Sequence, residues 1–332
     1  MMAFREEAAG MSKDTAGKNT FLNAEKNINA GIGKIGFIGA GKVGTALGLY
    51  FIKKGLNVEG YASKNSESAK NAANITGTKA FLSLQELVDE CRVIFITVPD
   101  GQIGNVWKEI SVLDLKGKII CHTSGAETSK IFTGIENKNA FGLSLHPMFA
   151  FADKNGKAEG LENACFTVES LAAEFFAVES FSAESVAVES KNTIEEFIKE
   201  FFSVIGNRYF VIKSEDKPIY HLANVLASNL VLALLSISCE FMAGIGISEN
   251  DGLKALMPLI ENNINNIKNN GFINSLTGPV ERNDLKTVLR HSDVIPDKYK
   301  EIYRDLSMRL LELSQKKHPE RDYSELNRLL GQ

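Results

Sequence analysis

Residues Lys34–Leu49 read KIGFIGAGKVGTALGL, in which an apolar run ends at a glycine and a helical pattern follows. The run Ile35–Ile38 predicts a short buried strand, and from Val43 onward apolar residues recur at helical spacing. Between them, GAGKVG at residues 39–44 fits the pattern G-x-G-x-x-G. This pattern indicates a dinucleotide site only in such a strand–turn–helix context, because there each glycine has a defined role.

The three glycines of this turn would serve different purposes. Gly39 would permit the tight turn, Gly41 would let the backbone approach a pyrophosphate, and Gly44 would let the helix pack closely on the strand. The anion would lie on free backbone N–H groups at the positive end of the helix. A glycine-rich turn without a ligand is the weaker alternative, because both flanking elements are present. The predicted cofactor residues in this turn are Gly39, Ala40, Gly41, Lys42, Val43 and Gly44.

Length and composition fit one large or two ordinary domains with a sizeable core. The chain has 332 residues, of which 44% are hydrophobic and 23% charged. A net charge of -4 indicates no general affinity for nucleic acid or for an anionic membrane. The four cysteines are far apart and form no C-x-x-C motif, as is typical of buried thiols in a reducing cytosol. We expect a cytoplasmic protein without a metal site.

Three changes of pattern suggest the domain organisation. Residues 1–31 mix charged and small residues without periodicity, and we expect a disordered tail that is neither a signal nor a transit peptide. Residues 32–213 alternate apolar runs with helical patterns, except for a low-complexity insertion at 171–190 in which Val-Glu-Ser recurs. Residues 214–332 are helical throughout. The expected fold is therefore α/β, a Rossmann-like parallel sheet covered on both faces and followed by an all-α C-terminal domain.

In such sheets, ligands bind beyond the carboxyl ends of the strands. The loops after five predicted strands should therefore surround one crevice. These loops follow Ile38, Tyr61, Val98, His122 and Leu145.

The tip of the second strand should select the cofactor. An acidic residue there would bind the ribose of NAD, whereas basic and hydroxyl groups would favour the 2′-phosphate of NADP. The tip carries Ser63 and Lys64, while Glu59 falls inside the predicted strand. We therefore expect NADP, although a small error in the strand boundary would let Glu59 reach the ribose of NAD.

Residues at the ends of three later strands are candidates for the chemistry. Val98 and Pro99 would lie under the nicotinamide–ribose region. Transfer of a hydride to a carbonyl or imine needs a nearby acid to protonate the product. His122 and Ser124 follow one strand and His146 ends the next, so all three would face the crevice. For either histidine, the alternative is a hydrogen-bonded structural imidazole.

The segment Tyr220–Phe241 predicts one long, mostly apolar helix. His221, Asn224 and Ser228 share a narrow face of it, which would form either the substrate-facing wall of the crevice or a polar seam between helices. The polar residues make it a poor membrane span. Because its other faces are apolar, we expect a homodimer formed through the C-terminal helices.

Two features lie further along the helical region. Arg282 could bind a substrate carboxylate through its planar fork of donors, or it could pair locally with Asp284. Residues 318–332 read as a polar tail with a short helix.

Several of these motifs resemble a known bacterial family. They are GAGKVG at 39–44, VPD at 98–100, HTSGA at 122–126, SLHPMFAF at 144–151, YHLAN at 220–224, ASN at 227–229 and LTGPVERND at 276–284. The family has a Rossmann-like domain followed by a C-terminal domain of unknown function. It is similar to NADP oxidoreductases of the pyrroline-5-carboxylate reductase, prephenate dehydrogenase and 6-phosphogluconate dehydrogenase group.

The resemblance implies the fold, the cofactor and a C-terminal domain like that of 6-phosphogluconate dehydrogenase, but no particular substrate. Two departures stand out. Asn283 replaces the family's usual glycine, which predicts a reshaped loop, and the segment His146–Phe149 is closer to that of prephenate dehydrogenase.

Together these features predict an NADP-dependent oxidoreductase that acts on a small carbonyl, imine or hydroxy-acid substrate. His146 or His221 would be the acid–base group, Ser124 would orient the substrate, and Asn224, Ser228 and Arg282 would bind it. The alternatives are an NADP-binding regulatory module without turnover and a prephenate dehydrogenase-like enzyme.

Overall fold

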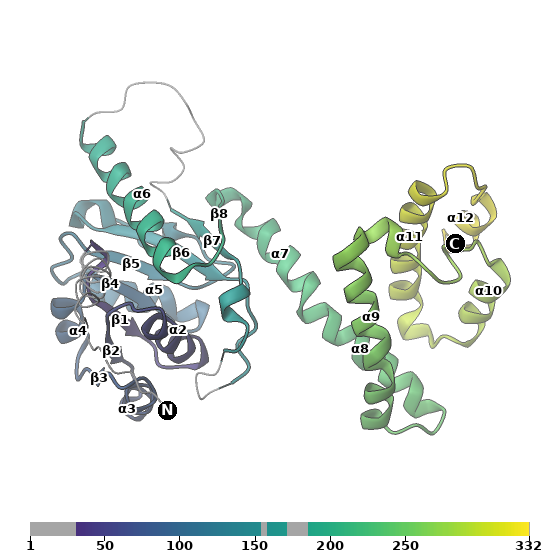
Figure 1. Ribbon diagram of the computed structural model, residues 1–332, viewed down its shortest axis with the longest axis horizontal. Coiled ribbons are helices and arrows are strands. Elements are labelled where there is room, and N and C mark those ends of the chain that lie inside the picture. The colour runs from purple at the N-terminus through teal and green to yellow at the C-terminus, as the bar shows by residue number, and fades with distance from the viewer. Residues whose placement is uncertain (1–30, 154–157, 171–184, 332) are drawn as a thin grey trace, which may run out of the picture. The chain divides into compact units, whose positions relative to one another are not determined.

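The computed structural model describes residues 31–153, 158–170 and 185–331, with side chains from residue 193 onward in the last range. Residues 1–30 of the tail predicted at 1–31, and residues 171–184 of the predicted insertion, lie outside the described residues. The chain divides into two compact units, which end at Leu230 and Gln332 (Figure 1). The first unit thus extends beyond the expected domain end at Lys213. Each unit is described by itself.

The first unit is built on an eight-stranded sheet with the order β3-β2-β1-β4-β5-β6-β7-β8. Neighbouring strands are parallel except for β6 and β7, which are antiparallel. The strands are β1 Ile35–Ile38, β2 Val58–Ala62, β3 Lys79–Ala80, β4 Val93–Ile96, β5 Ile119–His122, β6 Phe141–Pro147, β7 Phe166–Glu169 and β8 Tyr209–Val211. The Rossmann-like sheet predicted from the sequence is therefore confirmed.

Helices cover both faces of this sheet (Figure 1). They are α2 Lys42–Lys53, α3 Ser66–Thr76, α4 Leu84–Glu90, α5 Asp100–Ile110 and α6 Ser185–Ile205. The next helix, α7 Lys217–Ala227, leads away from the sheet (Figure 1). On one face, Phe37 and Phe95 pack with Phe51 of α2 and Phe201 of α6. The opposite face buries Ile94 and its neighbours against α4 and α5. Alternate residues of each strand thus enter different cores, as the continuous apolar runs require.

The antiparallel pair β6–β7 departs from the regular alternation of parallel strands and connecting helices. A parallel pair needs a crossover connection, usually a helix. Among the described residues between β6 and β7, the only helical element is a 3-10 turn, Leu161–Asn163. The following crossover is α6, which joins β7 to the parallel strand β8. Because α6 begins at Ser185, residues 185–190 of the predicted low-complexity insertion belong to this helix.

The second unit is helical and has its own small core. Its helices are the greater part of α8 Asn229–Gly244, then α9 Glu249–Ser275, α10 Leu285–Val294, α11 Lys300–Lys317 and α12 Ser324–Leu330. The core contains Val280, Val288, Leu311, Tyr323, Leu326 and Leu330. Because Leu326 and Leu330 are buried, the interpretation of residues 318–332 as a polar tail was wrong.

The predicted single helix Tyr220–Phe241 is also corrected. Two helices, α7 and α8, occupy this segment, and the backbone leaves the helical conformation at Ser228 with φ −126° and ψ −75°. By length and composition, the stretch Ser214–Gly244 could nevertheless cross a membrane. Its most apolar 18-residue segment has a mean hydropathy of 1.9, and 6% of that segment is buried. Among the described residues it is the single stretch that meets this test.

Candidate functional site

The glycine-rich turn joins β1 to α2 as its sequence predicts. Gly39 has φ 109°, and a Cβ there would lie 2.8 Å from the carbonyl oxygen of Thr97 on the neighbouring strand connection. A Cβ on Gly44 would overlap the carbonyl oxygen of Gly39 and lie 2.5 Å from Thr97 Oγ1. Both positions therefore exclude any larger residue for steric reasons. Gly41 differs, because a Cβ there would meet nothing within 4 Å.

The N-terminus of α2 is free to bind an anion. Gly41 is its N-cap residue, no side chain caps the helix, and the first turn contains no acidic residue. The first backbone N–H groups of a helix have no partner within it, and the helix dipole makes this end positive. The open space above Gly41 adjoins these groups. This is the arrangement that a diphosphate requires.

A cavity of about 1240 Å³ lies beside this helix end. Seven of the predicted cofactor residues line it: Gly39, Ala40, Gly41, Ser63, Lys64, Val98 and Pro99. Lys42, Val43 and Gly44 lie in the first turn of α2 and do not line it. The cavity exceeds the volume of an ordinary small-ligand pocket, and its lining includes both the glycine-rich turn and the tip of β2.

The tip of β2 presents Ser63 and Lys64 to the cavity. The loop is fixed by Asn65, whose Oδ1 accepts hydrogen bonds from the backbone of Glu67 at 3.0 Å and thereby caps α3. Glu59 lies within β2, and its Oε2 is 3.0 Å from Lys34 Nζ. Because Glu59 does not line the cavity, this carboxylate is not placed to bind a ribose there.

A second group of polar side chains lies at the ends of β5 and β6, beyond the cavity lining. His146 Nδ1 is 2.5 Å from the hydroxyl oxygen of Tyr220 on α7, and the two rings meet edge to face. Burial, assisted by the nearby charges of Lys217 and His221, lowers the pKa of His146 to about 4. His146 is therefore neutral at physiological pH.

The imidazole rings of His146 and His221 converge on Gly125, in the loop after β5. A Cβ on Gly125 would lie 2.9 Å from His146 Nε2 and 3.0 Å from His221 Nδ1. His221 Nδ1 is buried and has no hydrogen-bond partner among the described residues. The structure thus brings together two of the predicted catalytic histidines, one from β6 and one from α7.

His122 is less suited to catalysis than His146. It is fully buried, and its Nδ1 accepts a hydrogen bond from the backbone of Ser124 at 3.2 Å. Burial lowers the pKa of His122 to about 3, with smaller contributions from Lys217 and His146. These surroundings favour the structural alternative for His122.

The hydroxyl of Ser124 shapes the same loop. Its Oγ accepts hydrogen bonds from the backbone N–H groups of Ala126 at 3.1 Å and Glu127 at 2.9 Å. Both bonds use lone pairs, so the single hydroxyl proton remains for another acceptor. Ser124 therefore holds the loop that carries Gly125, and its role in orienting a substrate stays a prediction.

Lys217 is a residue of this group that sequence reasoning missed. It is the first residue of α7 and is fully buried, with Nζ donating to the carbonyl oxygen of Ser124 at 2.7 Å and to Ser144 Oγ at 2.6 Å. Burial lowers its pKa to about 8, and the nearby charge of Glu169 opposes this. The sequence signal that could have identified Lys217 is a lysine directly before a long apolar segment.

Glu169, at the end of β7, is the buried carboxylate near Lys217. It accepts hydrogen bonds from the backbone of Ser129 at 2.7 Å, from Ser129 Oγ at 2.8 Å and from Ser214 Oγ at 2.7 Å. Both of its oxygens are thus satisfied, as a buried charge requires. This network connects the loop after β5 to the segment that leads into α7.

Asn224 and Ser228 are bonded to their own helix. Asn224 Nδ2 donates to the carbonyl oxygen of Tyr220 at 2.8 Å, and Ser228 Oγ donates to that of Asn224 at 2.6 Å. Each bond spans four residues and competes with the regular helical pattern, and α7 ends at this point. Their contact with a substrate stays a prediction.

Arg282 belongs to the second unit, on the turn before α10. The neighbouring Asp284 caps α10 by accepting a hydrogen bond from the backbone of Thr287 at 3.1 Å. Asn283 has φ 58°, a left-handed conformation that glycine favours and asparagine tolerates, and its Nδ2 donates to the carbonyl oxygen of Asp322 at 2.9 Å. Asparagine can therefore supply a glycine-like backbone here, against the expectation that it reshapes the loop.

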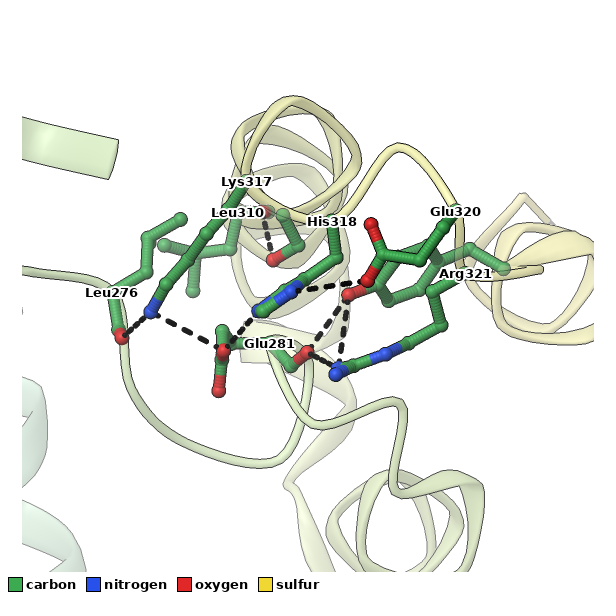
Figure 2. Close-up of polar contacts among 9 residues, drawn as sticks. Leu276, Glu281, Leu310, Lys317, His318, Glu320 and Arg321 are labelled. Atoms are coloured by element: carbon green, nitrogen blue, oxygen red, sulfur yellow. Dashed lines mark hydrogen bonds and ion pairs between the residues drawn. The ribbon is translucent and has the colours of Figure 1, made fainter. Parts of the chain in front are cut away.

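Figure 2 shows the hydrogen bonds and ion pairs through which the C-terminal segment holds the loop that carries Arg282. Glu281 Oε1 lies 2.7 Å from His318 Nε2 and 3.3 Å from Lys317 Nζ, and Lys317 also donates to the carbonyl oxygen of Leu276 at 2.9 Å. Arg321 donates to the carbonyl oxygen of Glu281 at 2.7 Å. The hydrogen bond from His318 is the main cause of a lowered pKa of Glu281.

Models of known families match both halves of the chain. Residues 20–147 match a Rossmann-like domain, and residues 185–310 match a domain of unknown function, DUF2520. The chain is a Rossmann-like domain followed by a DUF2520 domain. This confirms the resemblance stated from the sequence. The DUF2520 match begins within α6, so it includes α7 with Lys217, Tyr220 and His221.

One curated relative matches part of the Rossmann-like DUF2520 chain. The Bacillus subtilis (strain 168) protein named "Putative 6-phosphogluconate dehydrogenase YqeC" is 29% identical over 140 residues. The match covers 41% of this chain and 45% of that protein, so it spans less than half of either.

Solved structures resemble the Rossmann-like DUF2520 chain over most of its length. Protein TM1727 from Thermotoga maritima has a TM-score of 0.61 and 26% identity, covering 86% of this chain and 99% of that one. The "putative NADP oxidoreductase BF3122" from Bacteroides fragilis has a TM-score of 0.59, 19% identity and coverage of 88% and 99%. Plasmodium falciparum pyrroline carboxylate reductase, solved with NADP bound, has a TM-score of 0.51, 15% identity and coverage of 86% and 96%. The chain thus has the fold of NAD(P)-dependent oxidoreductases.

Proposed function

We propose that the protein is an NADP-dependent oxidoreductase that acts on a small carbonyl, imine or hydroxy-acid substrate. The observation that carries the proposal is the uncapped N-terminus of α2, with open space above Gly41, beside a cavity of about 1240 Å³. The backbone N–H groups there would bind the diphosphate. Val98 and Pro99, which belong to the same lining, would support the nicotinamide and its ribose.

The preference for NADP rests on the tip of β2. Lys64 is exposed and lines the cavity with Ser63, which gives a 2′-phosphate one cation and one hydroxyl. The nearest acid in the strand, Glu59, is engaged with Lys34. At the tip of β2, residues 63–65 offer no carboxylate for the ribose hydroxyls of NAD, and Glu109, the acidic residue among the described lining residues, belongs to α5.

The bound nicotinamide would supply two electrons and a hydrogen to the substrate carbon. The chain would contribute the acid–base groups, and His146 and His221 are the best placed for this role because both face Gly125. Gly125 follows β5, the strand next to β4, whose end leads to Val98 and Pro99. A small substrate would therefore lie along this edge of the sheet. Arg282 remains a proposed partner for a substrate carboxylate.

Calorimetric titration with NADP and NAD tests the proposal. We expect wild type to bind NADP at least about tenfold more tightly than NAD, since a hydrogen bond to a charged group contributes about 1.5–3 kcal/mol. Lys64→Gln should remove most of this difference. Lys70→Gln is the matched control, because Lys70 is exposed on α3 and does not line the cavity. Equal affinity for both nucleotides in wild type would contradict the NADP preference, and binding of neither would contradict the function.

A regulatory module that binds NADP without turnover is the second candidate. One observation favours it: none of the described lining residues of the cavity is a histidine. Oxidation of NADPH in the presence of a panel of carbonyl and imine compounds separates the two. Turnover supports the oxidoreductase, whereas tight NADPH binding with no turnover across the panel supports the module. Oxidation of prephenate in the reverse assay would identify a prephenate dehydrogenase-like enzyme.

We also propose that a second copy of the chain covers exposed apolar residues of α7 and of α8. Ile219 and Leu226 on α7 are 65% and 54% exposed, and Leu232 on α8 is 67% exposed. Exposed large apolar side chains of this kind can mark a protein–protein contact. Sedimentation equilibrium should give a dimer, and Leu226→Glu with Leu232→Glu should shift it to a monomer. A wild-type monomer that floats with phospholipid vesicles would instead assign this surface to a membrane.

A further inference from the structure

We propose that Tyr220 is a positioning residue, which fixes His146 as a neutral imidazole with its proton on Nε2, the nitrogen that faces Gly125 and that would donate to the C=O or C=N group of the substrate. This inference rests on the oxidoreductase function proposed above. It assigns a role to Tyr220 and a protonation state to His146, and neither can be read from the sequence.

The contact between Tyr220 and His146 determines the tautomer. The Tyr220 hydroxyl lies 2.5 Å from His146 Nδ1, and the ring planes are at 83° with centroids 5.6 Å apart. A phenol is a stronger hydrogen-bond donor than an imidazole N–H, and an imidazole nitrogen is a stronger acceptor than a phenol oxygen. Tyr220 therefore donates to Nδ1. The proton of the neutral ring must then be on Nε2.

The surroundings keep this ring neutral. His146 is largely buried, which disfavours its charged form, and the ammonium group of Lys217 is held nearby by Ser124 and Ser144. Burial also raises the pKa of Tyr220, so its hydroxyl keeps the proton that it donates. Both ends of the hydrogen bond are thus neutral in the resting protein.

Gly125, which has no side chain, lets the imidazole of His146 approach the loop after β5 closely. A Cβ on this residue would lie 2.9 Å from Nε2 and 3.0 Å from Nδ1 of His221, so the two nitrogens approach the same side of the loop. Nε2–H can donate to a carbonyl oxygen or an imine nitrogen. His221 Nδ1, which has no partner among the described residues, can accept from a neighbouring hydroxyl or ammonium group of the same substrate. A small molecule with a C=O or C=N group next to a donor meets both requirements.

The arrangement also supplies the proton for reduction. Reduction of C=O or C=N adds two electrons and a hydrogen to carbon, and the heteroatom then takes one proton. His146 gives that proton from Nε2, and Nδ1 takes the proton of Tyr220, so the imidazole stays neutral. The resting tautomer is restored when Nε2 takes a proton from water and Nδ1 returns its proton to the phenolate of Tyr220. One proton from solvent is consumed in each cycle.

Nitrogen NMR of the full chain labelled in histidine, without cofactor, tests the assignment. The chemical shifts of Nδ1 and Nε2 report which nitrogen is protonated, and His146→Gln identifies the signals of His146 by their loss. Wild type should show His146 protonated on Nε2. Tyr220→Phe should give a mixture of tautomers, because the donor to Nδ1 is gone. Protonation of Nδ1 in wild type, or an unchanged spectrum in Tyr220→Phe, would overturn the proposal.

The second unit offers a matched control. Tyr303 lies 2.9 Å from Nδ1 of His291, in a similar edge-to-face contact. Tyr303→Phe should alter the signals of His291 and leave those of His146 unchanged. A change at His146 in this variant would overturn the assignment, because it would show that the signals report global structure.

A kinetic measurement follows if turnover is found. Tyr220→Phe should lower kcat by about 10²-fold and change KM less than about threefold, as expected for loss of a proton donor. A merely structural role for Tyr220 would leave the tautomer unchanged. The NMR result does not depend on turnover, so an inactive protein with the expected tautomer would contradict the proposed function and leave the role of Tyr220 intact.

Discussion

The ammonium group of Lys217 lies 2.7 Å from the carbonyl oxygen of Ser124, so the first residue of α7 is tied to the loop that follows β5. The helix brings Tyr220 and His221, and the loop brings Gly125. Because the lysine is fully buried, the bond is protected from water and is stronger than a similar bond at the surface. The geometry of the proposed acid–base residues therefore depends on this contact.

Replacing Lys217 with methionine should affect both stability and titration. The variant loses two hydrogen bonds, to Ser124 and Ser144, and we expect the free energy of unfolding to fall by about 1–3 kcal/mol. The pKa of His146 should rise, because the positive charge that opposes its protonation is removed. Urea unfolding and NMR titration measure the two effects. Lys213→Met is the control, since that side chain is 51% exposed. A folded Lys217→Met variant with an unchanged His146 pKa would contradict this account.

The pH dependence of stability should reveal the neutral His146. Its pKa is lowered from 6.5 to about 4 by burial, so the unfolded chain binds more protons between these values. Stability should therefore be fully present above pH 6.5 and fall as the pH decreases toward 4, with a slope from this residue of up to about 1.4 kcal/mol per pH unit. His146→Gln should reduce that slope. Unfolding midpoints measured across this range would contradict the prediction if the variant and wild type had the same slope.

The close approach of Gly44 to Gly39 predicts that an alanine substitution costs much more stability at Gly44 than at Gly41. Gly44→Ala places a methyl group against the carbonyl oxygen of Gly39 and the hydroxyl of Thr97, and should cost about 1–3 kcal/mol of stability. Gly41→Ala meets no neighbour and should cost less than about 1 kcal/mol. Thermal unfolding of the two variants compares them directly. If the two variants lost the same stability, the close contact of Gly44 with Gly39 would be contradicted.

In the second unit, Glu281→Gln should loosen the loop that carries Arg282. The variant weakens the contacts with Lys317 and His318, and we expect a loss of about 1 kcal/mol, measured by hydrogen exchange in this loop. Because the pKa of Glu281 is lowered, its contribution in wild type should disappear as the pH falls through its folded value, below 4.5. Glu312→Gln is the control, as its partner Arg309 is also exposed. Faster exchange in the control alone would contradict the role of Glu281.

The parts of the fold that sequence reasoning predicted depend on local patterns. The turn at Gly39–Gly44 is specified by neighbouring residues, and so are the apolar strands around it. The end of β2 likewise places Ser63 and Lys64 without reference to distant segments. The cofactor side of the candidate site was therefore accessible from the sequence.

The parts that were missed depend on contacts between distant residues. Lys217 is 93 residues from Ser124 and 73 from Ser144 in the sequence, so its burial left no periodic signal. The break at Ser228 arises where side chains compete with helical hydrogen bonds, although the apolar pattern continues through it. Residues 318–332 were predicted to be a polar tail because only a few of them, such as Leu326, enter the core.

The central claim is that backbone N–H groups at the N-terminus of α2 bind the diphosphate of a nicotinamide dinucleotide. Calorimetric titration of wild type and Gly41→Ala with NADP tests it most directly, because the added methyl group fills space reserved for the ligand and touches nothing in the protein. We predict saturable binding to wild type and at least about a tenfold loss, or 1.4 kcal/mol, in a variant that remains folded. Equal affinity in the two proteins, or no binding to wild type, would contradict the claim.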